Sequence, residues 1–223
     1  MRAWRGLELN NCRRIRSHLL VLFVLAAVSS QVTATPSYFG YTGLMITPTA
    51  DTLKTGGFNA GGVFVIDDSN NTSFWSANVG LLDSLEVGGA LVSPEHGDSN
   101  GIINAKFRLL NEDISVPALA IGISDLTDEL DTTPYVVASK SLQISGENPY
   151  APRLHVGFGG GHLDGLFAGL SATATDRIQL MVEYDTNDVN FGVQFAVAQS
   201  LRLHAGLVGG DNLGLGLNYN VGF

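Results

Sequence analysis

The sequence predicts an all-β fold, a transmembrane antiparallel β-barrel of about 12 strands that follows an export leader. The chain consists largely of runs of eight to eleven residues between turn signals, with no long stretch of helical apolar spacing. The carboxyl-terminal run 212–223 is apolar on one face, small or polar on the other, and aromatic at its free end, Phe223. A membrane barrel presents such strands to lipid, lumen and interface.

Residues 1–34 have the features of a secretory signal peptide. Five arginines precede an apolar core from Leu19 to Val28, and Val32-Thr33-Ala34 supplies a small-residue cleavage site. The core is too short to cross a bilayer as a helix, so a retained anchor is the less favoured alternative. Cys12, the only cysteine, lies in this leader. The predicted mature chain therefore contains neither a disulfide framework nor thiol chemistry.

The charge balance excludes nucleic acid as a partner. The leader carries five of the 12 basic residues and one of the 21 acidic residues. The remaining chain then has 7 basic and 20 acidic residues, a formal charge of −13. Such a chain repels a phosphate backbone.

Residues 35–56 form a short amino-terminal segment ahead of the first predicted strand. The apolar and aromatic side chains from Tyr38 to Ile46 should be buried against another part of the protein, and Pro48 disfavours a central strand. Two interpretations stay open: the segment tucks into or against the barrel as a plug, or it extends into the periplasm.

Residues 57–223 are predicted to form the barrel. An even number of strands suits a closed bacterial barrel. The twelve predicted strands are 57–66, 72–80, 84–92, 102–110, 115–124, 134–144, 153–161, 165–173, 176–184, 189–198, 200–209 and 212–223. The strand 134–144 needs a bulge or a choice of register before Lys140 can be placed.

The composition of the second face favours a membrane over water as the outer solvent. A soluble barrel would place its apolar set inside and cover its other face with charge. Here the second face is mostly Gly, Ala, Ser and Asn, which suits a crowded or partly hydrated lumen. A soluble barrel or sandwich remains the alternative.

The connections divide into two sets if both chain ends are periplasmic. The outward connections then carry twelve of the 20 acidic residues: Asp67, Asp68, Glu95, Asp98, Asp125, Asp128, Glu129, Asp131, Asp164, Asp185, Asp188 and Asp211. Most inward turns are tight, apart from 145–152. Longer outer loops and shorter inner turns are typical of outer-membrane barrels.

Basic residues and histidines occur on strand positions that should face the lumen. The predicted lumen and ligand-binding residues are Lys106, Arg108, Arg153, His155, Arg177, Glu183, Arg202 and His204. Two interpretations stay open. The cations guide an anionic or hydroxyl-rich chain by many weak contacts, or they pair with lumenal carboxylates such as Glu86 and Glu183 in a structural network.

Catalytic and metal sites are disfavoured by the local sequence. His155 and His162 could serve a hydrolase at the rim, but no nucleophile elbow accompanies them. The acidic groups at 67–70 and 125–131 could offer ligands to Ca²⁺ or Mg²⁺, but neither has the spacing of an EF-hand. We predict no catalytic residue, metal or cofactor.

The segment Gly43-Leu44-Met45-Ile46-Thr47-Pro48-Thr49-Ala50, ahead of Gly57-Phe58, resembles the YjbH-type family of outer-membrane proteins associated with exopolysaccharide production. Further blocks of the resemblance follow in order at 106–110, 117–125 and 135–140. The resemblance gives the motif residues Gly43, Thr47, Pro48, Thr49 and Ala50. It implies a barrel that handles or secretes polysaccharide without enzymatic chemistry. Family members are longer, with a second barrel-like region, so this chain is a shortened relative.

Together these observations predict a porin-like, non-enzymatic barrel of the bacterial outer membrane. It would take part in exopolysaccharide export or passage through a partly cationic lumen. The alternatives are a structural or adhesive barrel acting through its acidic outer loops and, less favoured, a rim hydrolase. The expected partners are outer-membrane lipid and lipopolysaccharide, polysaccharide, secretion components and the barrel-assembly machinery.

Overall fold

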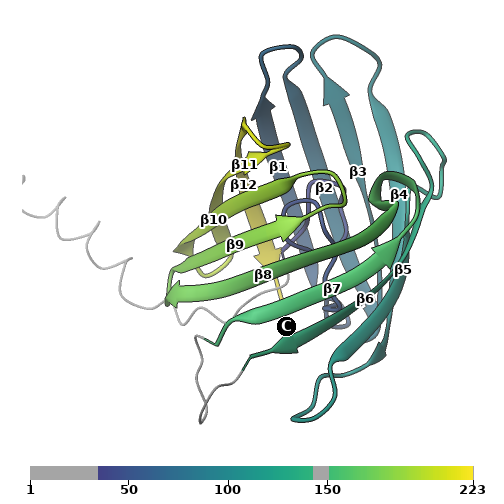
Figure 1. Ribbon diagram of the computed structural model, residues 1–223, viewed down its shortest axis with the longest axis vertical. Helices are drawn as coiled ribbons and strands as arrows, with labels where there is room; N and C mark the ends of the chain where they lie inside the picture. Colours follow the sequence, from purple (N-terminus) through teal and green to yellow (C-terminus); the bar gives the residue numbers. More distant parts are fainter. Residues whose placement is uncertain (1–34, 143–150, 223) are drawn as a thin grey trace, which may run out of the picture.

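Twelve antiparallel strands close into one barrel in the computed structural model, which describes residues 35–142 and 151–222 (Figure 1). Each strand pairs with its sequence neighbours, and β1 pairs with β12 to close the ring. The predicted signal peptide and Phe223 lie outside the described residues. The strands are β1 (Phe58–Ile66), β2 (Thr72–Leu82), β3 (Leu85–Pro94), β4 (Asn100–Leu110), β5 (Ala118–Ser124), β6 (Thr133–Ser141), β7 (Arg153–Gly159), β8 (Gly165–Thr175), β9 (Ile178–Tyr184), β10 (Val189–Ala198), β11 (Leu201–Val208) and β12 (Asn212–Val221).

All twelve predicted strands are present, and their bounds differ where turn chemistry intervenes. The strand predicted at 115–124 begins only at Ala118, because Pro117 has no backbone N–H to give to a ladder. The strand predicted at 153–161 ends at Gly159, because a 3₁₀ turn, η1 (Gly161–Leu163), follows with Gly161 at φ 58°. No helix in the described part of the chain is long and apolar enough to cross a membrane.

The strand faces have the predicted direction, with the apolar rows outward. On β10, Val189, Phe191, Val193 and Phe195 are exposed, whereas the alternating residues Asn190, Gln194 and Ala196 are buried. The largest outward side chains include Trp75, at 61% exposure, and Phe158, at 60%. Since large apolar side chains cover the outside and amides lie inside, hydrocarbon is the solvent that suits this exterior.

The two ends of the barrel differ. The connections after odd-numbered strands form what we call the loop end: 67–71, 95–99, 125–132, 160–164, 185–188 and 209–211. The connections after even-numbered strands form the turn end: 83–84, 111–117, 142–152, 176–177 and 199–200. Four strand pairs shift register, and each shift lies at the turn end. Strand β6 pairs without a shift, and Lys140 falls on its outward row near the turn end.

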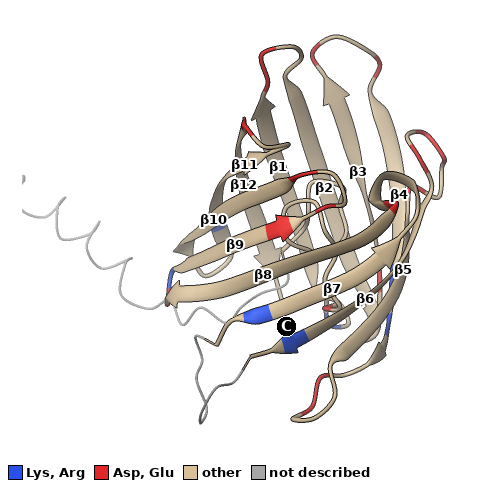
Figure 2. Cartoon of the chain, viewed as in Figure 1, with Lys and Arg blue, Asp and Glu red and all other residues tan. Residues whose placement is uncertain are grey.

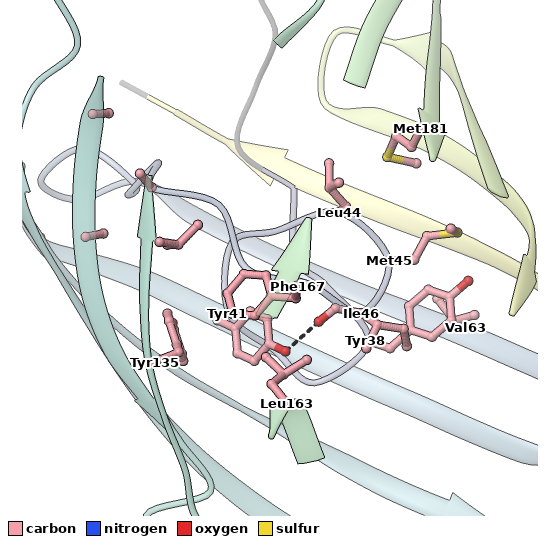
Figure 3. Packing of buried hydrophobic residues seen from close by; sticks show 14 of the residues in the cluster. Tyr38, Tyr41, Leu44, Met45, Ile46, Val63, Tyr135, Leu163, Phe167 and Met181 are labelled. Carbon is pink, nitrogen blue, oxygen red and sulfur yellow. Dashed lines mark hydrogen bonds between the residues drawn. The ribbon is translucent and has the colours of Figure 1, made fainter. Parts of the chain in front are cut away.

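Residues 35–56, which we call the plug, lie inside the barrel over 35–53, and 54–56 are exposed where the chain leaves at the turn end (Figures 1 and 3). Tyr41, Met45 and Ala50 are at most 1% exposed. The cluster of buried apolar residues forms between plug and wall, with Tyr38, Tyr41, Leu44, Met45, Ile46 and Ala50 from the plug and Val63, Val65, Ala118, Ala120, Tyr135, Val137, Leu163, Phe167 and Met181 around it. The hydrophobic core is therefore assembled inside the barrel around the amino-terminal segment.

Small wall residues make room for the plug. A Cβ atom at Gly192 would lie 2.6 Å from the Met45 sulfur. Within the plug, Gly40 turns the chain at φ 87°, where a side chain would collide with the carbonyl of Gly89. The glycine-rich lumenal face thus lets the segment approach the wall closely.

Candidate functional site: the plug and its anchors in the lumen

Glu86 and Lys106 form the first anchor between wall and plug. The Glu86 carboxylate, on β3, accepts hydrogen bonds from the Thr42 N–H at 2.8 Å, the Thr42 hydroxyl at 2.7 Å and the Leu53 N–H at 3.1 Å. Lys106 on β4 pairs with Glu86 at 3.0 Å and donates to the carbonyls of Thr42 and Thr49. Both side chains of the pair are at most 2% exposed. This buried pair is satisfied only while the plug is in place, because plug groups complete its hydrogen bonds.

Glu183 on β9 forms the second anchor. Its carboxylate accepts the N–H groups of Ile46 and Thr47 at 2.7 and 3.1 Å, and the Thr47 hydroxyl at 2.7 Å. Asn190 on β10 adds an amide donor at 3.4 Å. Donors from one turn of the plug and from the neighbouring strand thus converge on a single carboxyl group. The turn that contains the motif residues is thereby fixed to one side of the wall.

The third anchor lies nearer the turn end. The Ala50 N–H donates to the Ser139 hydroxyl at 2.9 Å, and Ser139 shares a 2.7 Å hydrogen bond with His155. The next plug residue, Asp51, pairs with Arg153 at 2.5 Å. Burial alone would raise the pKa of Asp51, but the Arg153 guanidinium outweighs it and holds that pKa below its usual value.

Arg153 also links the plug to the β4–β5 turn. Its second terminal nitrogen lies 3.0 Å from the Glu112 carboxylate. Further along the plug, the Thr55 N–H and hydroxyl donate to the Asp83 carboxylate at 2.9 and 2.8 Å. Arg108 donates to the Asp83 carbonyl at 2.8 Å. The plug thus leaves the lumen through a polar, charged collar at the turn end.

Aromatic contacts hold the side of the plug nearer the loop end. The Tyr41 hydroxyl donates to the Ile46 carbonyl at 2.5 Å and closes the plug on itself (Figure 3). Phe39 stacks on the His162 ring with centroids 4.5 Å apart, and His162 also hydrogen-bonds Thr133 at 2.8 Å. Burial lowers the pKa of His162 to about 4. This imidazole is therefore neutral near pH 7.

The sequence comparison decides the family. The family described as "Exopolysaccharide biosynthesis protein YbjH" matches residues 35–165, which cover the plug, β1–β7 and the start of β8. The chain belongs to the YjbH family. Each of the three anchors holds part of the motif through which the chain resembles this family: Lys106 holds Thr49, Glu183 holds Ile46 and Thr47, and Ser139 holds Ala50. No curated protein matches the chain.

Solved porin structures share the barrel of this YjbH-family chain. A structure titled "KdgM porin" matches with a TM-score of 0.55 and 10% identity, over 72% of this chain and 98% of that chain. A second, titled "KdgM porin in complex with disordered oligogalacturonate", matches with a TM-score of 0.52 and 10% identity, over 73% and 98%. At this identity the likeness shows the fold alone: a porin-like barrel of twelve strands.

The structure brings five of the eight predicted lumen residues to the plug or its immediate supports. Three of them, Lys106, Arg153 and Glu183, bond to the plug directly. His204 shares a 2.7 Å hydrogen bond with Tyr38 of the plug. His155 shares a hydrogen bond with Ser139, which in turn holds the plug. Arg108 lies at the turn-end collar, Arg202 is buried near the start of β11, and Arg177 lies in the β8–β9 turn. The predicted network is therefore present for Lys106 with Glu86, and it includes the plug.

Sequence reasoning missed Asp51, Thr42 and Ser139 as anchor residues. A signal for Asp51 was available, because a carboxylate directly after the Thr-Pro-Thr-Ala block ends an otherwise uncharged segment. Ser139 had no signal. Its role depends on the pairing of β6 with β7, which sets it beside His155.

The two ends of the barrel differ in charge (Figure 2). The charged residues of the loop end are all acidic, whereas the turn end carries both signs, with Asp51, Asp83, Glu112, Asp113 and Asp176 beside its basic residues. The twelve acidic residues of the predicted outer connections all lie at the loop end. All basic residues of the described chain lie at or near the turn end: Lys54, Lys106, Arg108, Lys140, Arg153, Arg177 and Arg202. A field of this kind gives an anionic chain different energies at the two mouths.

Carboxylates in the acidic loops accept hydrogen bonds from backbone N–H groups of the same loops. Asp125 accepts the N–H groups of Glu129, Leu130 and Asp131 at 2.7–3.1 Å. Among the described residues no group of three or more His, Cys, Asp or Glu side chains is arranged to hold a metal ion.

His155, the candidate base of a hydrolase, is 2% exposed and lies between Ser139 and Ser171. A substrate cannot reach this imidazole while the plug is seated.

Proposed function

We propose that this YjbH-family barrel lies in the bacterial outer membrane and takes part in exopolysaccharide export without enzymatic chemistry. In this proposal the lumen is the path, and the plug closes it at rest. The observation that carries the proposal is the difference in charge along the barrel: the loop end carries carboxylates without cations, and the basic residues of the described chain lie toward the turn end, where acidic residues accompany them (Figure 2).

The outer membrane is supported by the exterior of the barrel. Its outward rows are mainly apolar, with Lys140 near the turn end as an exception, and the porin structures share its fold. The end of β12, at the turn end, then belongs to the periplasmic side. The tight turns face the periplasm and the longer acidic loops face outward. Assembly there requires the barrel-assembly machinery, and lipid and lipopolysaccharide are the surrounding partners.

The charge difference supports an outward direction for an anionic chain. The basic residues at the periplasmic mouth nearly balance the carboxylates there, so an anionic chain meets less repulsion at this mouth than at the acidic outer rim. The carboxylates at the outer rim offer it no counter-charge, so the chain is released there rather than retained. The porin structure with disordered oligogalacturonate concerns another protein, and it supports acidic saccharide as a class of cargo.

The bonding pattern of the plug supports a movable closure. Its isolated β-bridges, Pro36 with Thr42 and Gly43 with Pro48, lie within the plug itself. The strands of the wall pair with each other around the whole ring. Moving the plug therefore breaks side-chain anchors and packing but leaves the ladder of the barrel intact.

Export from cells tests the proposal. Cells that lack this protein should release less exopolysaccharide, and the wild-type gene should restore release. The double substitution Arg108→Gln and Arg202→Gln, at lumen-facing positions, should lower release in complemented cells. Lys140→Gln removes one positive charge from the outward face and should leave release at the wild-type level. Equal release from all strains, with folded barrels present by heat-modifiable gel mobility, would contradict an export role.

A structural or adhesive barrel is the second candidate, favoured by the twelve carboxylates at the loop end. These carboxylates could bridge lipopolysaccharide phosphates through divalent cations. This candidate requires no passage through the lumen. It predicts that Asn and Gln substitutions in the loops weaken surface binding, whereas lumenal substitutions have no effect.

A further inference from the structure

We propose that Asp51 occupies the place of a cargo carboxylate, and that a carboxylate-bearing polysaccharide opens the lumen by competing with Asp51 for Arg153. This inference rests on the proposed export function and names the cargo class and the release step. The plug is in this view an internal competitor of the cargo.

The Arg153 guanidinium has the geometry of a carboxylate receptor. One terminal nitrogen holds Asp51 at 2.5 Å and the other lies 3.0 Å from Glu112. The remaining nitrogen, Nε, is buried and has no hydrogen-bond partner among the described residues. A guanidinium can bind a carboxylate through two parallel N–H groups, so Arg153 has a donor that Asp51 does not use.

This ion pair can be reached from the periplasmic mouth. The side chains of Arg153 and Asp51 are 21% and 32% exposed, whereas the Lys106–Glu86 pair deeper in the lumen is at most 2% exposed. An incoming chain therefore meets Arg153 before it meets the buried anchors.

The wall beside Arg153 carries groups that suit sugar hydroxyls. Ser139, His155 and Ser171 form a hydrogen-bonded row across β6, β7 and β8. Ser171 is the cross-strand partner of Arg153, and Ser139 is that of His155. The Ala50 N–H now covers Ser139. Departure of the plug would expose a cation, two hydroxyls and an imidazole on adjacent strands, which can bind a carboxylate and its neighbouring hydroxyls.

The exchange of one carboxylate for another keeps the charge balance of the site. Asp51 is tethered and competes at a high effective concentration, so a single free carboxylate is a weak rival. A polyuronate presents many carboxylates on one chain and overcomes this advantage by repeated rebinding. A neutral polysaccharide cannot replace Asp51, because it would leave Arg153 with one counter-charge fewer.

Thiol labelling at position 50 measures release of the plug directly. Ala50 is fully buried, so Ala50→Cys in a Cys12→Ser background should react slowly with a bulky maleimide while the plug is seated. The purified full chain is tested in detergent with a mannuronate oligomer and with its fully methyl-esterified form. We expect the oligomer to speed labelling roughly twofold to fivefold, as loss of one partly exposed ion pair implies. The ester should have no effect.

Asp51→Asn should label quickly without the oligomer and gain little from it. Asp113→Asn is the matched control, because this aspartate lies at the same end and its carboxylate accepts the Ile114 N–H of its own turn. It should label like the parent. Thr52→Cys provides a second labelling site if the first variant does not fold.

Equal effects of the oligomer and its ester, or a normal oligomer response in Asp51→Asn, would overturn the inference. Export from cells is a separate readout. If export depends on Arg108 and Arg202 while the oligomer leaves the plug seated, the cargo class and release step are wrong and the export function stands.

Discussion

The Glu183 carboxylate receives both the backbone N–H and the hydroxyl of Thr47, at 3.1 and 2.7 Å. The two residues lie 136 positions apart, one in the plug and the other on β9. Their contact shows how the family motif works in three dimensions. Thr47 and its neighbour Ile46 offer three donors in one turn, and a single lumenal carboxylate accepts all of them.

Replacement of Glu183 by Ala should loosen the plug. Three buried donors would lose their acceptor, at a cost of about 1–3 kcal/mol for each group left without a partner. We expect faster maleimide labelling of Ala50→Cys in this background and a lower midpoint in thermal unfolding. Glu95→Ala, at the loop end, removes the same charge away from the plug and serves as control. Labelling as slow as in the parent would show that Glu183 does not anchor the plug.

Lys106→Met should destabilise the whole protein. The substitution leaves Glu86 as a buried carboxylate without its cation, which costs about 3–5 kcal/mol. The double variant Lys106→Met with Glu86→Gln should recover part of this loss, since the remaining amide carries no charge. Urea unfolding of the parent, Lys106→Met, Glu86→Gln and the double variant in detergent measures the four free energies of unfolding. Additive effects of the two substitutions would contradict a direct pair.

Gly192→Val should displace the plug by steric contact. The added side chain would enter the space of the Met45 sulfur, which lies 2.6 Å from the position of a Cβ atom. We expect a loss of about 1–3 kcal/mol in unfolding free energy. Met45→Ala alone should also destabilise, but in the Gly192→Val background it should relieve the clash and restore stability. Absence of this rescue would mean that the plug does not pack at this point of the wall.

Acidification should weaken the contact between the plug and the β7–β8 connection through His162. Burial lowers its pKa to about 4, although Asp131, Asp125 and Asp185 act in the opposite direction. The unfolded chain therefore binds this proton more readily than the folded protein. The stability is full above about pH 6.5 and is lost as the pH falls toward 4. Thermal unfolding from pH 8 to 4 should show a smaller fall in His162→Phe than in the parent. The exposed His96→Gln should behave like the parent.

Local patterning predicted most of the barrel. Alternation along β10 and β12 specifies which residues face outward, because the side chains of a strand alternate with a period of two. Glycines and acidic residues marked the connections. The errors are at strand ends such as Ala118 and Gly159, where proline and the 3₁₀ turn end the pairing. These bounds depend on single hydrogen bonds rather than on the periodicity.

The site was predicted only in part, because its contacts join distant segments. The lumenal direction of Lys106, Arg153 and Glu183 followed from strand parity. Their partners Thr42, Asp51 and Thr47 lie in a segment without regular secondary structure. The alternation of side chains that predicts direction along a strand therefore says nothing about which wall residues they contact. The sequence left two positions open for residues 35–56, and the structure places 35–53 inside the barrel.

Ionic current through a locked plug tests the central claim most directly. Ala50→Cys with Ser139→Cys, in a Cys12→Ser background, joins two residues that already share a 2.9 Å hydrogen bond. In planar bilayers the oxidised protein should stay closed, while the reduced protein and the single variant Ala50→Cys should open in the presence of the mannuronate oligomer. Equal current through the oxidised and reduced protein would contradict the account that residues 35–56 close the path.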